Sequence, residues 1–62
     1  MSKYHVGQEV FFIDDEETCV CEGVIDTIQV DSQGLTYTLE DLPYRFAESD
    51  LYKTKKEAKE VL

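Results

Sequence analysis

The chain of 62 residues carries 14 acidic and 6 basic side chains, a net charge of −8, so it holds one small domain with one hydrophobic core. It has no apolar run long enough to cross a bilayer, and its first residues, MSKYH, lack the apolar stretch of a secretory signal. The acidic balance disfavours direct contact with nucleic-acid phosphates. We therefore expect a single cytoplasmic domain over residues 1–62 that binds neither nucleic acid nor membrane.

The first β signal is the apolar run VFFI at positions 10–13. In a strand, Val10 and Phe12 face one way, and Phe11 and Ile13 face the other. The interior of a small barrel can cover only one of these pairs. The pair Phe11 and Ile13 therefore needs a second cover, either another part of the chain or a partner.

A second β-rich run spans residues 18–30, after four acidic residues at 14–17 that suit a solvated turn. It is long for one flat strand, and Gly23 within it indicates a bulge or a sharp bend. Cys19 and Cys21 share one face of this strand, at a spacing at or beyond the usual limit for a disulfide. We expect them to be reduced thiols.

A tight turn and a half-buried strand come next. The segment DSQG at 31–34 favours a hairpin turn, because Asp and Ser suit its opening and Gly tolerates positive φ. Over residues 35–40, large apolar side chains alternate strictly with polar ones. A turn at 41–43 leads into a short strand over 44–47, and residues 48–52 are expected to form a tight turn or one 3₁₀ turn.

The periodicity becomes helical over residues 53–62. Thr54 begins a capping box that Glu57 completes. The apolar residues that follow share one helical face: Ala58, Val61 and Leu62. A helix of about eight residues is unstable alone in water, so it must dock on the sheet. We expect its apolar face to cover the outer side of the first strand, and deletion of residues 53–62 to destabilise the domain.

Four or five short strands and one helix predict a mainly β fold, an antiparallel barrel over 1–52 with a C-terminal helix over 53–62. Four motifs resemble SH3-like barrels of the Tudor and KOW type: YxVGQxV at 4–10, GVIxxI at 23–28, YxL at 37–39 and FxESDLY at 46–52. The chain is also similar to small bacterial and phage proteins whose barrel ends in a capped helix, as TKKEA at 54–58 would here. This resemblance implies the fold; such barrels host many unrelated functions.

Residues suited to catalysis or metal binding are few. The only histidine, His5, lies near the N-terminus, and a domain of this size has little volume for a catalytic cleft. His5, Cys19 and Cys21 offer three zinc ligands where a structural site uses four, although Glu22 could complete the set. The acidic run at 14–17 lacks the pattern of a calcium loop. We expect no enzyme activity, no cofactor and no metal.

The first functional hypothesis is a small binding module that holds a protein partner through an aromatic patch or an edge strand. Its candidate partner-binding residues are Phe11, Ile13, Tyr44 and Arg45, with Tyr4 or Tyr52 as further surface aromatics. Tyr37 and Phe46 are expected in the core. The Tudor-type resemblance implies a cage for a methylated cation, and the KOW-type resemblance implies RNA, which the acidic body disfavours.

Two alternatives stay open at this point. The acidic body could mimic nucleic acid and occupy a phosphate-binding groove on a host enzyme, as some phage inhibitors do. The charges concerned are Asp14, Asp15, Glu16, Glu17, Glu40, Asp41, Glu48 and Asp50. The surplus apolar face or an unpaired strand edge could also join two copies, so the chain is expected to be a monomer or a weak homodimer.

Overall fold

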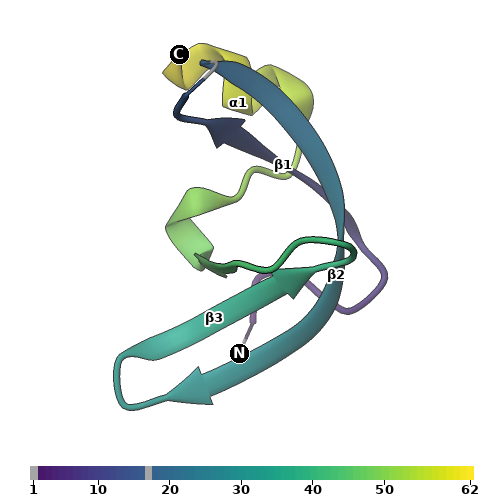
Figure 1. Cartoon of the computed structure of the whole chain (residues 1–62), viewed down its shortest axis with the longest axis vertical. Helices are drawn as coiled ribbons and strands as arrows, with labels where there is room; N and C mark the ends of the chain where they lie inside the picture. The colour runs from purple at the N-terminus through teal and green to yellow at the C-terminus, as the bar shows by residue number, and fades with distance from the viewer. Residues whose placement is uncertain (1, 17) are drawn as a thin grey trace.

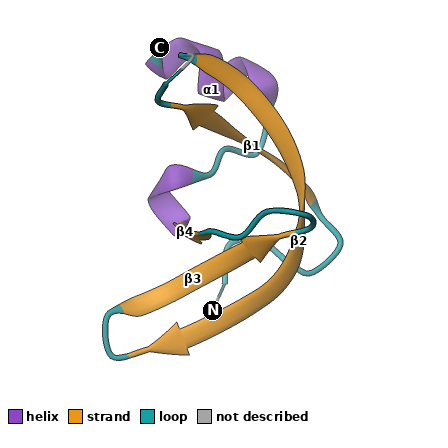
Figure 2. Cartoon of the chain, in the orientation of Figure 1, coloured by secondary structure: helices purple, strands orange, loops and turns teal. Residues whose placement is uncertain are grey.

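The computed structural model describes residues 2–16 and 18–62. Its elements are β1 (Glu9–Asp14), β2 (Cys19–Asp31), β3 (Gly34–Leu39), β4 (Arg45–Ala47), the 3₁₀ helix η1 (Glu48–Asp50) and α1 (Lys55–Val61). The strands form one antiparallel sheet in the order β1-β2-β3-β4, which curls into a half-barrel with α1 at one end (Figures 1 and 2). The predicted mainly β fold with a C-terminal helix is confirmed, and the arrangement is compatible with an SH3-like fold.

The long strand β2 produces the curvature because it pairs with two neighbours in succession. Residues 19–24 pair with β1, and the register with β3 begins at Ile25, with an irregularity between Ile25 and Thr27. The sequence predicted a bulge or bend at Gly23, and the irregularity instead lies after Gly23, between Ile25 and Thr27. Gly23 has a different role: a Cβ there would lie 2.8 Å from Cδ1 of Leu39, so glycine lets that side chain pack against the β2 backbone.

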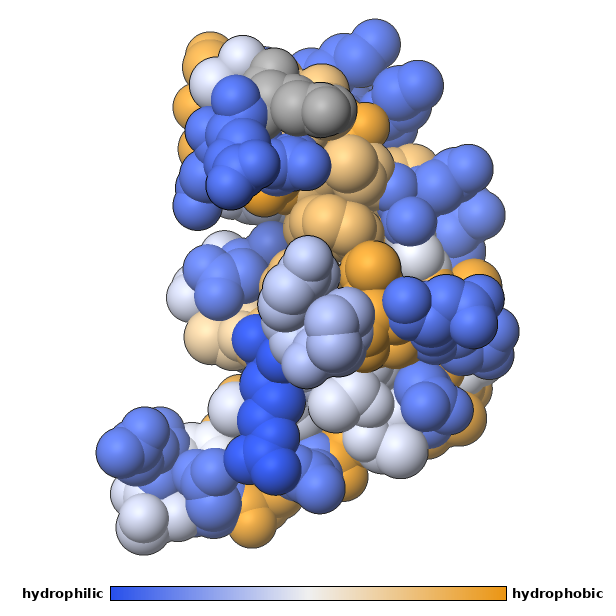
Figure 3. Space-filling view, in the orientation of Figure 1, coloured by the Kyte–Doolittle hydropathy of each residue, from blue (hydrophilic) through white to orange (hydrophobic). Residues whose placement is uncertain are grey.

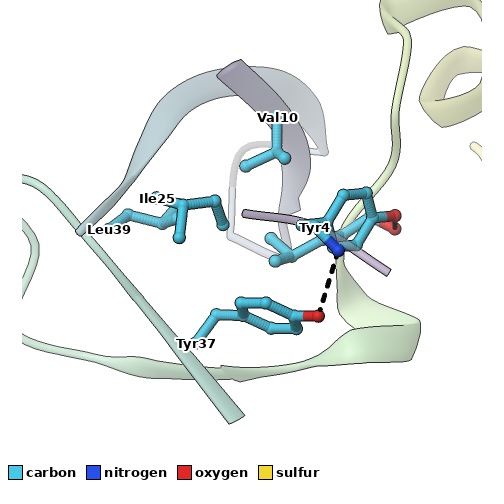
Figure 4. Close-up of a cluster of buried hydrophobic side chains, with 6 residues drawn as sticks. Tyr4, Val10, Ile25, Tyr37 and Leu39 are labelled. Carbon is cyan, nitrogen blue, oxygen red and sulfur yellow. Dashed lines mark hydrogen bonds between the residues drawn. The ribbon is translucent and has the colours of Figure 1, made fainter. Parts of the chain in front are cut away.

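The core occupies the concave side of the half-barrel. Its buried residues are Tyr4, Val10, Ile25, Tyr37, Leu39 and Leu51, most of which are labelled in Figure 4. The rings of Tyr4 and Tyr37 meet edge to face, with centroids 5.5 Å apart. The hydroxyl of Tyr4 donates to the carbonyl of Leu51 at 3.0 Å. Tyr4 thus belongs to the core rather than to the surface aromatics among which the sequence had placed it.

The outer edge of β1 is partly paired by a residue from the other end of the chain. The N–H of Phe11 donates to the carbonyl of Tyr52 at 2.9 Å, and the N–H of Tyr52 donates back at 2.8 Å. In an antiparallel ladder, alternate residues direct their backbone groups to the same edge. Ile13, two residues after Phe11, therefore directs its backbone N–H and C=O to the edge of β1 beyond this bridge.

Helix α1 docks against β1 and β2. The hydroxyl of Thr54 accepts from the N–H of Glu57 at 3.1 Å, which caps the first turn. Ala58 is fully buried, whereas Val61 and Leu62 are 60% and 57% exposed. The helix therefore covers its docking site with one small residue and leaves its last two apolar side chains half open. Neither helix in the described ranges is long and apolar enough to cross a membrane.

Candidate binding groove

A groove of about 550 Å³ lies where the β1–β2 turn, β4 and the end of α1 face one another. Figure 3 shows the molecule hollowed on this side, between the end that carries α1 and the middle that carries η1. The apolar residues that line it are Phe12, Ile13, Phe46, Val61 and Leu62, and the polar or amphipathic ones are Asp15, Thr18, Arg45, Asp50 and Tyr52. A smaller hollow shares Phe12 and Phe46 and extends to Tyr44. We call the two together the β1–β4 groove.

A row of three aromatic rings runs through this groove from the core to the solvent. Phe12 and Phe46 pack against the core, and their ring centroids lie 5.0 Å apart. The ring of Tyr44 meets Phe46 edge to face at 6.2 Å, and Tyr44 is 58% exposed. The strands explain the row, because β1 supplies the first ring and β4 with its preceding residue supplies the other two. The outer ring therefore contacts the inner pair through Phe46.

Three of the four predicted binding residues border the groove. Ile13 lines both hollows, Arg45 lines the larger, and Tyr44 lines the smaller. Phe11 lies elsewhere: it is half-buried and lines a separate small pocket with Lys55 of α1. Their role in binding a partner stays a prediction.

Sequence reasoning did not assign Phe46, Val61 or Leu62 to a binding surface. Phe46 looked like a core residue because it sits in a short strand, and it is in fact half-buried and shared by both hollows. Val61 and Leu62 were expected to pack against the sheet because they share a helical face with Ala58. A helix of only 7 residues has too little apolar area both to cover the strand and to bury its own last turn. The shortness of the predicted helix was therefore the feature of the sequence that could have indicated exposed apolar residues at its end.

Carboxylates surround the groove, and backbone contacts hold two of them in place. Asp14 accepts from the N–H of Glu16 at 2.9 Å, and Asp50 accepts from the N–H of Ala47 at 3.2 Å. Arg45 is the cationic residue among those lining the two hollows. The groove therefore combines an aromatic and aliphatic surface with a mainly negative rim, which favours cationic groups attached to apolar chains.

The other titratable groups lie away from this groove. His5 is exposed, and its imidazole Nδ1 lies 3.1 Å from the carbonyl oxygen of Val6, while its backbone N–H donates to the side-chain oxygen of Gln8 at 3.1 Å. Burial raises the pKa of Tyr37 above its ordinary value, and the carboxylate of Glu48 adds to this effect. The described residues bring no three His, Cys, Asp or Glu side chains together as a metal site would.

The groove offers apolar surface on Phe12 and Ile13, an exposed aromatic ring on Tyr44 that can contact cations, and carboxylates at the rim that can form ion pairs. The edge position of Ile13 suits an extended ligand. Comparisons with protein-family models, with curated proteins and with solved structures found no match to this chain.

Proposed function

We propose that this protein is a non-catalytic binding module of the cytoplasm, built on an SH3-like barrel of the Tudor and KOW kind. Its β1–β4 groove would hold an extended, basic segment of a partner protein. The observation that carries the proposal is the row of rings that ends in the exposed Tyr44, beside the edge of β1 and inside a rim of carboxylates. Each of these features suits a different part of one extended ligand.

The edge of β1 supports pairing with an extended segment. Among the described residues, Tyr52 bridges to Phe11, and Ile13 directs its backbone groups to the same edge, where a segment that continues the edge toward the β1–β2 turn would pair with them. Strand addition derives affinity from such main-chain hydrogen bonds and specificity from pockets for alternate side chains. The apolar side chains of the ligand would lie over the packed rings of Phe12 and Phe46, and a lysine or arginine would lie against Tyr44.

A peptide-display selection against the whole protein tests this proposal. Selected peptides are expected to alternate apolar residues with Lys or Arg, and to bind more weakly as salt rises, because the rim charges are exposed to solvent. Tyr44→Ala should weaken the binding of a selected peptide about tenfold or more, as loss of an exposed aromatic anchor does. Val30→Ala is the matched control, since Val30 is 76% exposed on the β2–β3 hairpin outside the lining residues of the groove.

The same measurements distinguish the nucleic-acid mimic. If Tyr44→Ala binds as tightly as the parent protein while the pair Asp15→Asn and Glu16→Gln abolishes binding, the partner reads the acidic surface and the groove proposal is wrong. Equal losses in the Tyr44 and Val30 variants would also contradict it, because a specific groove must distinguish the two sites.

A further inference from the structure

The two outer strands of the sheet, β1 and β4, are each partly covered at their outer edge by one segment of the same chain. At β1, the N–H of Phe11 donates to the carbonyl of Tyr52 at 2.9 Å, and the bridge is reciprocal. At β4, the N–H of Ala47 donates to a carboxylate oxygen of Asp50 at 3.2 Å. The segment that runs from β4 through η1 to Tyr52 therefore covers one position on each edge.

One further residue on each strand directs its backbone to the same edge. Alternate residues of an antiparallel strand present their N–H and C=O groups to the same side. Ile13 follows Phe11 by two residues in β1, and its groups therefore point away from β2. Arg45 precedes Ala47 by two residues in β4, and its groups likewise point away from β3. Both residues line the larger hollow of the β1–β4 groove.

These two edges face each other across the groove. Figure 2 shows β1 and β4 on opposite sides of the segment that carries η1. Successive antiparallel pairing makes β1 and β4 antiparallel to each other, and the rings of Phe12 and Phe46 meet at 5.0 Å. One step further along each strand, residue 13 of β1 corresponds to residue 45 of β4. The groove therefore has a hydrogen-bonding edge on each side.

We propose that the ligand of the groove is one extended segment of a partner protein that pairs with β1 at Ile13 and with β4 at Arg45, and so closes the half-barrel. This inference rests on the proposed function. A strand between two others lies about 4.8 Å from each and forms hydrogen bonds with both. The ligand would continue, by two residues on each edge, the cover that the chain's own segment begins. The carboxylates at the rim favour a segment that carries Lys or Arg.

Amide hydrogen exchange, followed by NMR on the whole protein, tests the double pairing. The probe is a capped hexapeptide of alternating lysine and valine. The N–H groups of Ile13 and Arg45 should both exchange at least about tenfold more slowly in the saturated complex, because each becomes a donor to the peptide. The N–H groups of Phe11 and Ala47 are the internal controls, since they already have partners in the free protein.

A proline variant tests the β4 edge separately. Arg45→Pro removes the N–H at the edge, and an outer strand tolerates proline where this N–H points away from its neighbour. Arg45→Ala is the matched control, because it removes the same guanidinium and keeps the N–H. The proline variant should bind the hexapeptide about threefold to tenfold more weakly than the alanine variant. If circular dichroism shows that the proline variant is unfolded, the exchange measurement on the parent protein decides.

The outcomes separate this inference from the proposed function. Slower exchange at Ile13 alone would overturn the inference and leave the proposed function standing, because the ligand would extend β1 without reaching β4. Unchanged exchange at both positions, with binding that still depends on Tyr44, would have the same meaning. Absence of any chemical-shift change around the groove on addition of the hexapeptide would contradict both.

Discussion

At the scale of single residues, Tyr37 joins three parts of the chain. Its hydroxyl accepts from the N–H of Tyr4 at 3.3 Å and donates to a carboxylate oxygen of Glu48 at 3.1 Å. The N-terminal segment, β3 and η1 therefore meet at one phenol. Because the ring is completely buried, the stability of this junction depends on the phenol staying neutral.

This dependence predicts an alkaline loss of stability. Tyr37 ionises near pH about 10 when unfolded, and burial raises its pKa in the folded protein. Its stabilising contribution is therefore complete below pH about 10 and is lost as the pH rises through the folded pKa. Urea unfolding from neutral pH upward should show the free energy of unfolding falling above that point.

Two variants check the assignment to this phenol. Tyr37→Phe should lower the free energy of unfolding at neutral pH by about 1–3 kcal/mol, because the buried N–H of Tyr4 loses its acceptor, and should make the alkaline fall shallower. Tyr44→Phe, at an exposed ring, should keep the parent slope. An unchanged slope in Tyr37→Phe would mean that another group causes the alkaline loss.

Gly23 gives a second prediction at this scale. Gly23→Ala should lower the free energy of unfolding by about 1–3 kcal/mol, because the new Cβ would overlap the buried Leu39 side chain. The cost should shrink in the background of Leu39→Ala, where the overlapping atoms are gone. A double-mutant cycle by urea unfolding measures the difference. Equal costs in both backgrounds would show that strand propensity, not the contact with Leu39, requires the glycine.

At the scale of elements, α1 stabilises the hairpin that it covers. Lys55 lines a pocket with Phe11 and Val20, and Leu62 lines the groove with Ile13, so the helix runs along the outer face of β1 and β2. Phe11 and Ile13 are the two side chains of the first strand for which the sequence analysis required a second cover. The helix is too short to form alone, so its docking and the burial of this face depend on each other.

Truncation after Tyr52 should therefore destabilise the domain without removing the Tyr52–Phe11 bridge. We expect a lower melting temperature and increased binding of a hydrophobic dye, since the outer side of β1 becomes exposed. Removal of Leu62 alone is the control, because this residue is already more than half exposed and should change little. A truncated protein that melts like the full chain would show that α1 does not stabilise the sheet.

The elements themselves were largely predictable, whereas their contacts were not. Strict alternation over residues 35–40 and the cap signal at 54–57 are local patterns. The first segment forms the expected strand, and the second begins a helix at which Thr54 accepts from the N–H of Glu57. The burial of Tyr4 depends on Tyr37 and Leu51, which are distant in the sequence. The groove likewise depends on the meeting of β1, β4 and the end of α1. No local pattern encodes contacts between segments that are distant in the sequence. The sequence therefore predicted an exposed aromatic at Tyr44 but not its contact with Phe46 or the pairing of Phe46 with Phe12.

At the scale of the whole molecule, the net negative charge destabilises the folded state through repulsion. The negative charges that make up the net charge of −8 on 62 residues repel one another, and several of the carboxylates line the β1–β4 groove. The same repulsion disfavours pairing of two copies through this side, so we expect the monomer to predominate at low salt.

Reducing the charge at the β1–β2 turn should therefore stabilise the fold. Asp15→Lys with Glu16→Lys adds two positive units at each exposed position and takes the net charge from −8 to −4. The melting temperature in low salt should rise, by the equivalent of up to about 1 kcal/mol, and its increase with added NaCl should become smaller. Lys53→Glu, at an exposed position, takes the charge from −8 to −10 and should act in the opposite direction. If both variants shift the melting temperature the same way, local contacts rather than the overall charge govern stability.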